Sequence, residues 1–355
     1  MKCWRKPCWM RKLLTLSSLL FLKRNKYLLL WLLVMLPGRW LYAQQSPGFA
    51  TLAMPAFAKM AALGGVNTSL YSRGYGMYLY NPALLNSETS GHLAATYALL
   101  PAGAGLSTVH CNFEVEKLGT FGAGLQYVGY GSIPAYDNTG APAGTFRASD
   151  LVLNLAHARQ AGNFRFGAGF KFAHTAISGY SASALMLDIG GLFVHPEKDF
   201  TVGLSIRNFG FVVNDFTTAG RTTLPFDVQA GTSFKPAHMP VRFSVTLHRL
   251  HEWNLLLPGE TATGLNAVLD NFFRHVALGA EVLVHKNVSL LTGYNRLRRA
   301  ELQPAGGGSF SGFSVGTEIT TSAFVFTYAF GGYNVAGNTN TFTLGANLAA
   351  LITRK

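Results

Sequence analysis

The stretch FRFGAGFKF, residues 164–172, decides the fold because its side chains alternate between two chemical kinds. Four phenylalanines and one alanine occupy the even-numbered positions. Arg165, Gly167, Gly169 and Lys171 occupy the odd-numbered ones. Successive side chains of a β-strand point to opposite faces. The stretch therefore predicts a strand with one apolar face and one face of cations and glycines.

The same alternation recurs in VRFSVTLH (241–248) and HVALGAEVLV (275–284), where Arg242, His248 and Glu281 fall on the polar face. A soluble sheet would alternate as well. However, 49% of the 355 residues are hydrophobic and only 13% are charged, which is too few charges to coat a soluble surface. We therefore predict a membrane barrel whose apolar face meets lipid, with Arg165, Lys171, Arg242, His248 and Glu281 in the lumen.

The alternation predicts an all-β fold, a transmembrane antiparallel barrel of about fourteen strands. The expected strands begin near Gly91, Ala104, Gly119, Asp150, Asn163, Ala182, Phe200, Phe226, Val241, His275, Val288, Ser309, Ser322 and Thr341. Short connections (159–163, 195–199) should lie at one end and long ones (131–149, 207–225, 251–274) at the outer end. The last residues, NLAALITRK, leave open whether 341–349 is the closing strand.

Residues 1–43 are predicted to be a signal peptide that is removed after Ala43. Nine basic residues and no acidic one lie in this leader, and its apolar run 27–37 is too short to cross a bilayer. Translation from Met1 or Met10 stays open. The net charge of +13 falls to +4 without the leader, which argues against nucleic-acid binding. Cys111 alone is left outside the leader, so no intramolecular disulfide is expected.

Residues 44–90 lack the alternation, and we predict that they form an N-terminal luminal hatch or plug, with Asn81 and Pro82 among its residues. The barrel would then comprise residues 91–355. Glycines within the strands would let such a plug approach the wall closely.

No catalytic, cofactor or metal site is expected from the sequence. Phosphate-binding glycine motifs and the serine nucleophile elbow are missing from it. His248, His251 and Glu252 offer metal ligands, but their spacing at a strand end does not match a zinc-protease helix.

Five stretches carry a resemblance to known outer-membrane proteins. MPAFAKMAALGG (54–65) and NPALLN (81–86) resemble the hatch region of FadL-like barrels of Bacteroidetes. KLGTFGAGLQYVGYGSI (117–133), LPFDVQAG (224–231) and FSVTLHRLHEWNL (243–255) resemble the PorQ-like proteins of the type IX secretion system. This resemblance implies a bacterial outer-membrane barrel of about fourteen strands with a hatch, without enzyme activity. It would belong to the cell-surface attachment complex, holding a PorZ-like extracellular protein beside PorU and PorV.

The long connections carry apolar side chains that would otherwise face water, so we expect them to dock the partner. The candidate contact residues are Tyr136, Phe146, Phe211, Phe216, Trp253 and Phe272. The alternative is a FadL-like transporter of small hydrophobic molecules past the hatch. An open lumen or a lateral gap would favour transport, and a filled lumen would favour docking.

Overall fold

The computed structural model describes residues 48–71, 75–217, 222–256, 264–302, 310–334 and 337–348. The predicted signal peptide, its cleavage site and the two candidate starts lie outside these residues.

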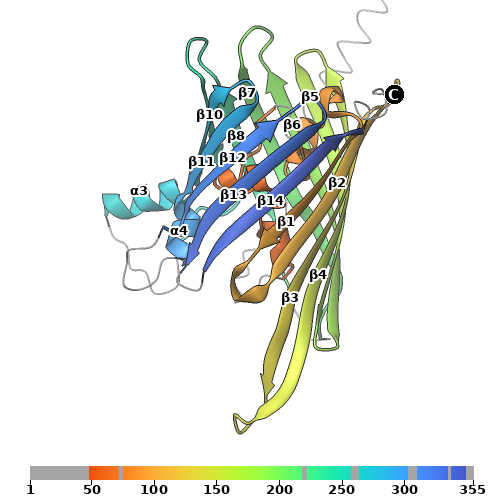
Figure 1. Ribbon diagram of the computed structural model, residues 1–355. Coiled ribbons are helices and arrows are strands. Elements are labelled where there is room, and N and C mark those ends of the chain that lie inside the picture. Colours follow the sequence, from red (N-terminus) through yellow and green to blue (C-terminus); the bar gives the residue numbers. More distant parts are fainter. Residues whose placement is uncertain are drawn as a thin grey trace, which may run out of the picture. The chain divides into compact units, whose positions relative to one another are not determined.

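Fourteen antiparallel strands form one closed barrel within the described residues (Figure 1). Each strand pairs with its neighbours in sequence, and the last pairs with the first, from His92 opposite Asn347 to Leu99 opposite Asn340. The closing strand is therefore the C-terminal one. The strands are β1 His92–Leu99, β2 Gly105–Val115, β3 Gly119–Tyr136, β4 Pro142–Ala161, β5 Phe164–Ile177, β6 Tyr180–Val194, β7 Phe200–Asn214, β8 Asp227–Phe234, β9 Val241–Leu247, β10 Val276–His285, β11 Val288–Asn295, β12 Phe313–Thr320, β13 Phe324–Asn334 and β14 Gly337–Asn347.

The predicted strand starts lie within four residues of these bounds, except for β4, which begins at Pro142 instead of Asp150. The expected long loop 131–149 is thus wrong. Most of it extends β3 and β4 into a hairpin that projects past the neighbouring strands (Figure 1). The alternation is interrupted here because the β3–β4 register shifts beside Gly131, whose φ is +75°. Asp137 closes the turn by accepting hydrogen bonds from the Thr139 and Ala141 amides.

The two ends of the barrel differ in their connections, as predicted. Short turns join β2 to β3, β4 to β5, β6 to β7, β8 to β9, β10 to β11 and β12 to β13. The opposite, long-loop end carries the β3–β4 hairpin, the β7–β8 connection and the helices α3 (Leu265–Arg274) and α4 (Arg296–Leu302). Among the described residues, no helix has the length and apolar character needed to cross a membrane.

Exposure alternates along the strands as the sequence predicts. On β5, Phe166 is 59% exposed, whereas its neighbour Arg165 is 4% exposed. Large apolar side chains face outward from most of the wall, including Leu93, Tyr97, Val109, Leu125, Leu153, Leu155, Leu187, Ile189, Leu204, Leu278, Leu290, Val315, Phe326 and Leu344. This band has the chemistry of a lipid-facing surface.

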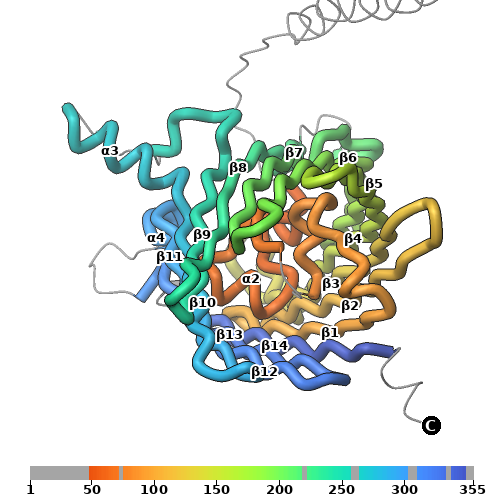
Figure 2. Tube along the Cα trace, turned by 90° about the horizontal axis from the view of Figure 1, so that it is seen from above, coloured from red at the N-terminus to blue at the C-terminus, as the bar shows by residue number. Residues whose placement is uncertain are grey.

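Residues 48–71 and 75–90, here called the luminal segment, run inside the ring of strands (Figure 2). They comprise the single-turn helix η1 (Ala50–Ala53), the short helix α2 (Ala58–Ala62) and the turns η2 (Met77–Leu79), η3 (Pro82–Leu84) and η4 (Ser87–Thr89). Their apolar side chains form a buried cluster with wall residues such as Ala156, Leu192 and Leu291.

Inward-facing glycines make room for the luminal segment. A Cβ at Gly167 would overlap the backbone of Pro82, one at Gly203 would overlap Thr68, and one at Gly293 would overlap Gly64. The backbone of the luminal segment thus occupies the space that side chains at these three positions would fill.

Candidate functional site

The turn at Asn81 and Pro82 fixes the middle of the luminal segment. Asn81 is fully buried, and its side-chain oxygen accepts a hydrogen bond from the Ala83 amide at 3.0 Å, which caps η3. Its side-chain nitrogen donates to the Thr68 carbonyl at 2.7 Å. Pro82 occupies the first position of η3, where its missing N–H costs nothing. Two separate parts of the luminal segment are thereby tied together.

Arg165 holds the same turn from the wall. Its guanidinium donates to the Ala83 carbonyl at 3.3 Å, to the Leu85 carbonyl, and to the Gln160 side chain at 2.6 Å. The carbonyls at the end of η3 are thus satisfied by a buried cation.

Lys171 lies in a second buried group of polar side chains. Its ammonium contacts Asp188 at 2.5 Å and donates to the Asn208 side chain at 2.9 Å. Asn208 has a left-handed backbone, with φ of 56°, at a bulge where both it and Arg207 are buried. Arg207 lies over the Tyr80 ring at 4.6 Å, so this group also contacts the luminal segment.

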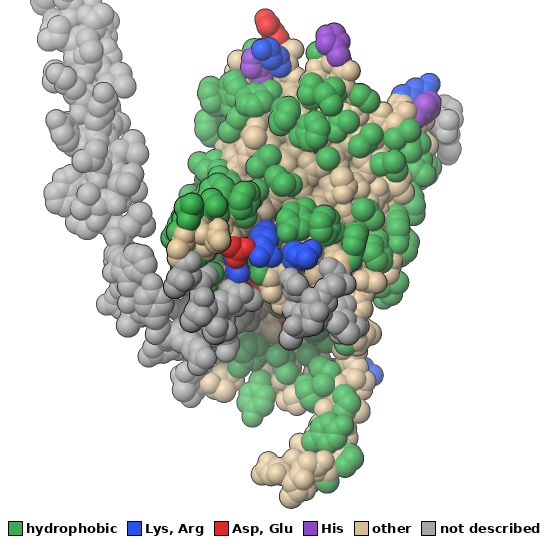
Figure 3. All heavy atoms as spheres, turned by 90° about the vertical axis from the view of Figure 1, so that its left-hand side faces the viewer, with side chains coloured by type: hydrophobic (Ala, Val, Ile, Leu, Met, Phe, Trp, Pro, Cys, Tyr) green, Lys and Arg blue, Asp and Glu red, His purple; other side chains and the backbone are tan. Residues whose placement is uncertain are grey.

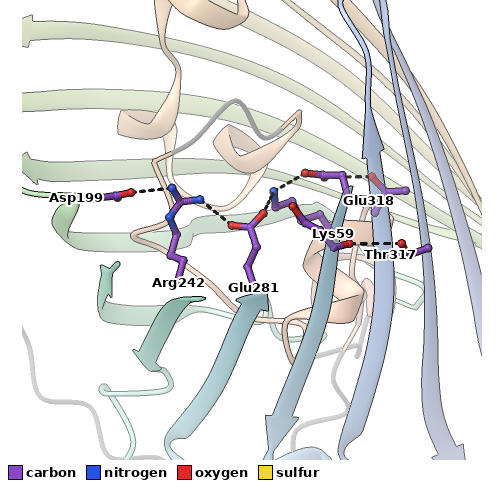
Figure 4. A network of polar contacts seen from close by, with 8 residues as sticks. Lys59, Asp199, Arg242, Glu281, Thr317 and Glu318 are labelled. Atoms are coloured by element: carbon purple, nitrogen blue, oxygen red, sulfur yellow. Dashed lines mark hydrogen bonds and ion pairs between the residues drawn. The ribbon is translucent and has the colours of Figure 1, made fainter. Parts of the chain in front are cut away.

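Lys59 on α2 joins the luminal segment to the wall through a chain of charges (Figure 4). Its ammonium lies 2.9 Å from a Glu281 oxygen and 2.8 Å from a Glu318 oxygen. Arg242 continues the chain, at 2.7 Å from Glu281 and 2.8 Å from Asp199. Burial alone would lower the pKa of Lys59, but the charges of Glu281 and Glu318 outweigh it and hold the pKa above its ordinary value of 10.5.

His248 is buried where β9 leaves the wall, and its backbone exchanges hydrogen bonds with His275. Trp253 stacks on the His275 ring with centroids 5.4 Å apart. The described part of the chain contains no group of three or more His, Cys, Asp or Glu side chains arranged to hold a metal.

An apolar groove of about 570 Å³ opens at the long-loop end. It is bounded by the projecting β3–β4 hairpin, the β5–β6 turn and the connection after β7. Its lining residues are Pro134, Ala135, Tyr136, Phe146, Ile177, Ser178, Tyr180, Phe216 and Thr217. Tyr136 and Tyr180 are more than 60% exposed, so the groove presents aromatic rings to solvent. Such a site suits a small apolar ligand or an apolar protein side chain.

Phe216 connects this groove to the luminal segment. It lines the groove and also packs on a buried cluster that contains Phe49 and Leu52. Asp215 fixes its position by accepting hydrogen bonds from the Phe216 amide and from the amide and hydroxyl of Thr222. The hydrogen bonds from Thr222 lower the pKa of Asp215, and the one from the Phe216 amide adds to the effect.

The six predicted contact residues divide among three places. Tyr136, Phe146 and Phe216 meet in the groove. Phe211 faces outward from β7, while Trp253 and Phe272 are exposed near α3.

Sequence reasoning missed Lys59, Ile177 and Tyr180. Ile177 and Tyr180 flank the tight β5–β6 turn at Ser178 and Gly179, which is too short to stand out as one of the long loops. Lys59 is the only charged residue in the otherwise apolar stretch 54–65. This isolation was the one sign in the sequence that it forms a buried ion pair.

A scan of protein-family models found no match, and a search of curated proteins found none either. Solved structures do match. The Pseudomonas putida toluene transporter TodX is similar with a TM-score of 0.51 and 13% identity, over 82% of this chain and 96% of that one. The Ralstonia pickettii toluene transporter TbuX is similar with a TM-score of 0.50 and 12% identity, over 82% of this chain and 97% of that one. The chain has the same barrel fold as these two transporters. A TodX deltaS2 mutant, described as a monoaromatic hydrocarbon channel, has a TM-score of 0.51 and 13% identity, over 83% of this chain and 97% of that one. At these identities the likeness establishes the fold alone.

Proposed function

We propose that this chain is an outer-membrane channel for small hydrophobic molecules, which it captures first in the apolar groove. The observation that carries this proposal is the double contact of Phe216. A ligand bound among Tyr136, Phe146 and Phe216 would touch the ring that also packs on Phe49 and Leu52 at the start of the luminal segment.

The luminal segment would act as a hatch. It fills the bore through apolar packing, buried hydrogen bonds and the charge chain of Lys59. Passage of a ligand therefore requires part of this segment to shift. TodX and TbuX, which share the fold, are named toluene transporters, and this supports a hydrophobic cargo for the present chain.

Binding to the groove tests this proposal. In lipid nanodiscs the protein should bind toluene, measured by saturation-transfer NMR. Replacing one aromatic ring, as in Tyr136→Ser or Phe146→Ser, removes about 1.5 kcal/mol of apolar burial, so affinity should fall about tenfold.

Phe211→Ser is the matched control, because Phe211 is an exposed aromatic at the same end that does not line the groove. Equal binding by the wild type and both groove variants would contradict a capture site in the groove.

A second candidate function is docking of an extracellular protein. Its support is the projecting β3–β4 hairpin, which carries Tyr136 and Phe146 beyond the wall, together with a lumen filled by the luminal segment (Figure 1). In this case the barrel would be a PorQ-like component of the type IX secretion attachment complex in Bacteroidetes. It would hold a PorZ-like partner beside PorU and PorV.

Identification of the proteins that purify with the wild type and with a variant lacking residues 133–146 tests the docking function. Affinity purification of the variant in mild detergent should lose the extracellular partner if docking is the function. If the wild-type protein purifies without PorZ-, PorU- or PorV-like proteins from cells that contain them, the docking function is wrong.

A further inference from the structure

Helix α3 carries an apolar face that no described part of the chain covers. Its five large apolar side chains, at 265, 268, 269, 272 and 273, follow the spacing of one helix face. Each is exposed, from 42% at Phe272 to 73% at Leu265. The adjacent Trp253 is 64% exposed.

The opposite face fastens α3 to the barrel. Asn271 accepts a hydrogen bond from the Leu255 amide and donates to the Trp253 carbonyl. Arg274 donates to the Leu255 carbonyl at 3.0 Å and pairs with Asp270, which also binds Arg296 of α4 at 2.6 Å. These buried contacts fix which face of α3 is left outward.

The helix projects sideways from the wall. Both the side view and the view along the barrel show it outside the ring of strands (Figures 1 and 2). At its C-terminal end it continues directly into β10, whose outward Leu278 belongs to the lipid-facing band. The apolar face of α3 therefore prolongs that band.

Positive charge gathers beside this apolar surface, on the side of the long-loop end (Figure 3). The residues 248–256, 264–274 and 296–302 contain five arginines against three carboxylates. The arginines are Arg249, Arg274, Arg296, Arg298 and Arg299. Along the barrel toward the long-loop end, the apolar band and the apolar helix face come first and the cations follow (Figure 3). Acyl chains and phosphates have the same order in a lipid leaflet.

We propose that α3 and the neighbouring arginines form a binding site for a phosphorylated lipid of the outer leaflet. The apolar face of α3 lies among the acyl chains, and Arg249 and Arg299, which are both partly exposed, contact the headgroup phosphates. Arg249 also lies 3.6 Å from Glu301 at the same edge. Trp253 lies at the interface, where indole rings are favoured. The site anchors the long-loop end at a fixed depth in the membrane.

Labelling in nanodiscs tests the depth of α3. In a chain with Cys3, Cys8 and Cys111 changed to alanine, the variants Leu269→Cys and Asn266→Cys each receive an environment-sensitive NBD probe. Asn266 is exposed at the side of the same helix and serves as the control.

Lipids brominated on their acyl chains should quench the probe at 269 at least twofold more than the probe at 266. A probe at 269 that iodide quenches freely overturns the proposal. So does one that neither quencher reaches, because a protein or a second copy then covers the helix.

The phosphate preference is tested with unlabelled protein. Nanodiscs that contain equal amounts of lipid A and phosphatidylcholine should give about fivefold enrichment of lipid A around the wild type, measured by mass spectrometry of co-purified lipid. The double variant Arg249→Gln/Arg299→Gln should lose most of this enrichment. Arg159→Gln/Lys198→Gln removes the same charge at the short-turn end and should keep it. Equal enrichment in all three proteins overturns the site.

Discussion

At the scale of single residues, Lys59 forms the ion pairs that attach α2 of the luminal segment to the barrel wall. Lys59 is the only cation that reaches both Glu281 and Glu318 among the described residues. Two inward carboxylates on separate strands would repel each other without it. The lysine thus links α2, β10 and β12 through charges that are almost fully removed from water.

Lys59→Met should therefore destabilise the protein, because it leaves the two carboxylates buried without their shared cation. We expect a loss of about 3 kcal/mol in the free energy of unfolding. Guanidinium unfolding of the protein in vesicles, followed by tryptophan fluorescence, measures it. Lys198→Met is the matched control, since Lys198 is exposed in a turn. A similar small effect of both substitutions would show that the charge chain does not fasten the luminal segment.

The groove should depend on pH through Asp215. The pKa of Asp215 is lowered in the folded protein. Its carboxylate therefore stabilises the loop fully above pH 3.8, the ordinary pKa of the group, and this stabilisation is lost as the pH falls through the lowered pKa. Toluene affinity should be constant above about pH 5 and decline below pH 4. Asp215→Asn should bind more weakly at neutral pH and show a smaller acid dependence. An unchanged pH profile in this variant would assign the acid sensitivity to another group.

At the scale of elements, β6 contains two adjacent glycines with opposite surroundings. Gly190 faces the lumen, where an added Cβ would overlap the side chain of Asn81. Gly191 faces outward and has no atom within 4 Å of the same position. The pair shows that Gly190 makes room for the luminal segment, since the three nearest atoms to a Cβ there belong to Asn81 and Ala83 and not to the wall.

Gly190→Ala should displace Asn81 and cost about 1–3 kcal/mol of stability. Gly191→Ala should change it by less than about 0.5 kcal/mol. Thermal unfolding in the same detergent compares them. Limited proteolysis should also cut the luminal segment faster in the first variant. Equal stability and equal cleavage of the two variants would mean that Asn81 can move away from residue 190 without destabilising the protein.

The sequence predicts those elements that depend on local alternation. Phe164, Phe166 and Phe170 mark β5 because each face of a strand repeats every second residue. The start of β4 was not predictable in this way, since the small residues from Pro142 to Thr145 give little contrast between the faces. The partners of Lys59 lie 222 and 259 residues away, so no local pattern contains that pairing. The groove likewise depends on Tyr136, Tyr180 and Phe216 from three connections meeting in space.

At the scale of the whole molecule, the closed barrel has an apolar outer band, a bore filled by the luminal segment and an apolar groove at its long-loop end. The groove and the segment share Phe216, so in the proposed channel capture and passage would take place next to each other. Because backbone pairing is continuous around the ring, the luminal segment is the part that must move for a molecule to pass.

Uptake by intact cells tests the proposed channel most directly, because lipopolysaccharide slows the entry of apolar molecules. Cells that express the protein should take up radiolabelled toluene several-fold faster than cells without it. Cells with Tyr136→Ser/Phe146→Ser at the same surface level should fall close to the rate of the empty strain. If the wild-type protein is folded in the outer membrane and uptake equals that of the empty strain, the chain is not a channel for hydrophobic molecules.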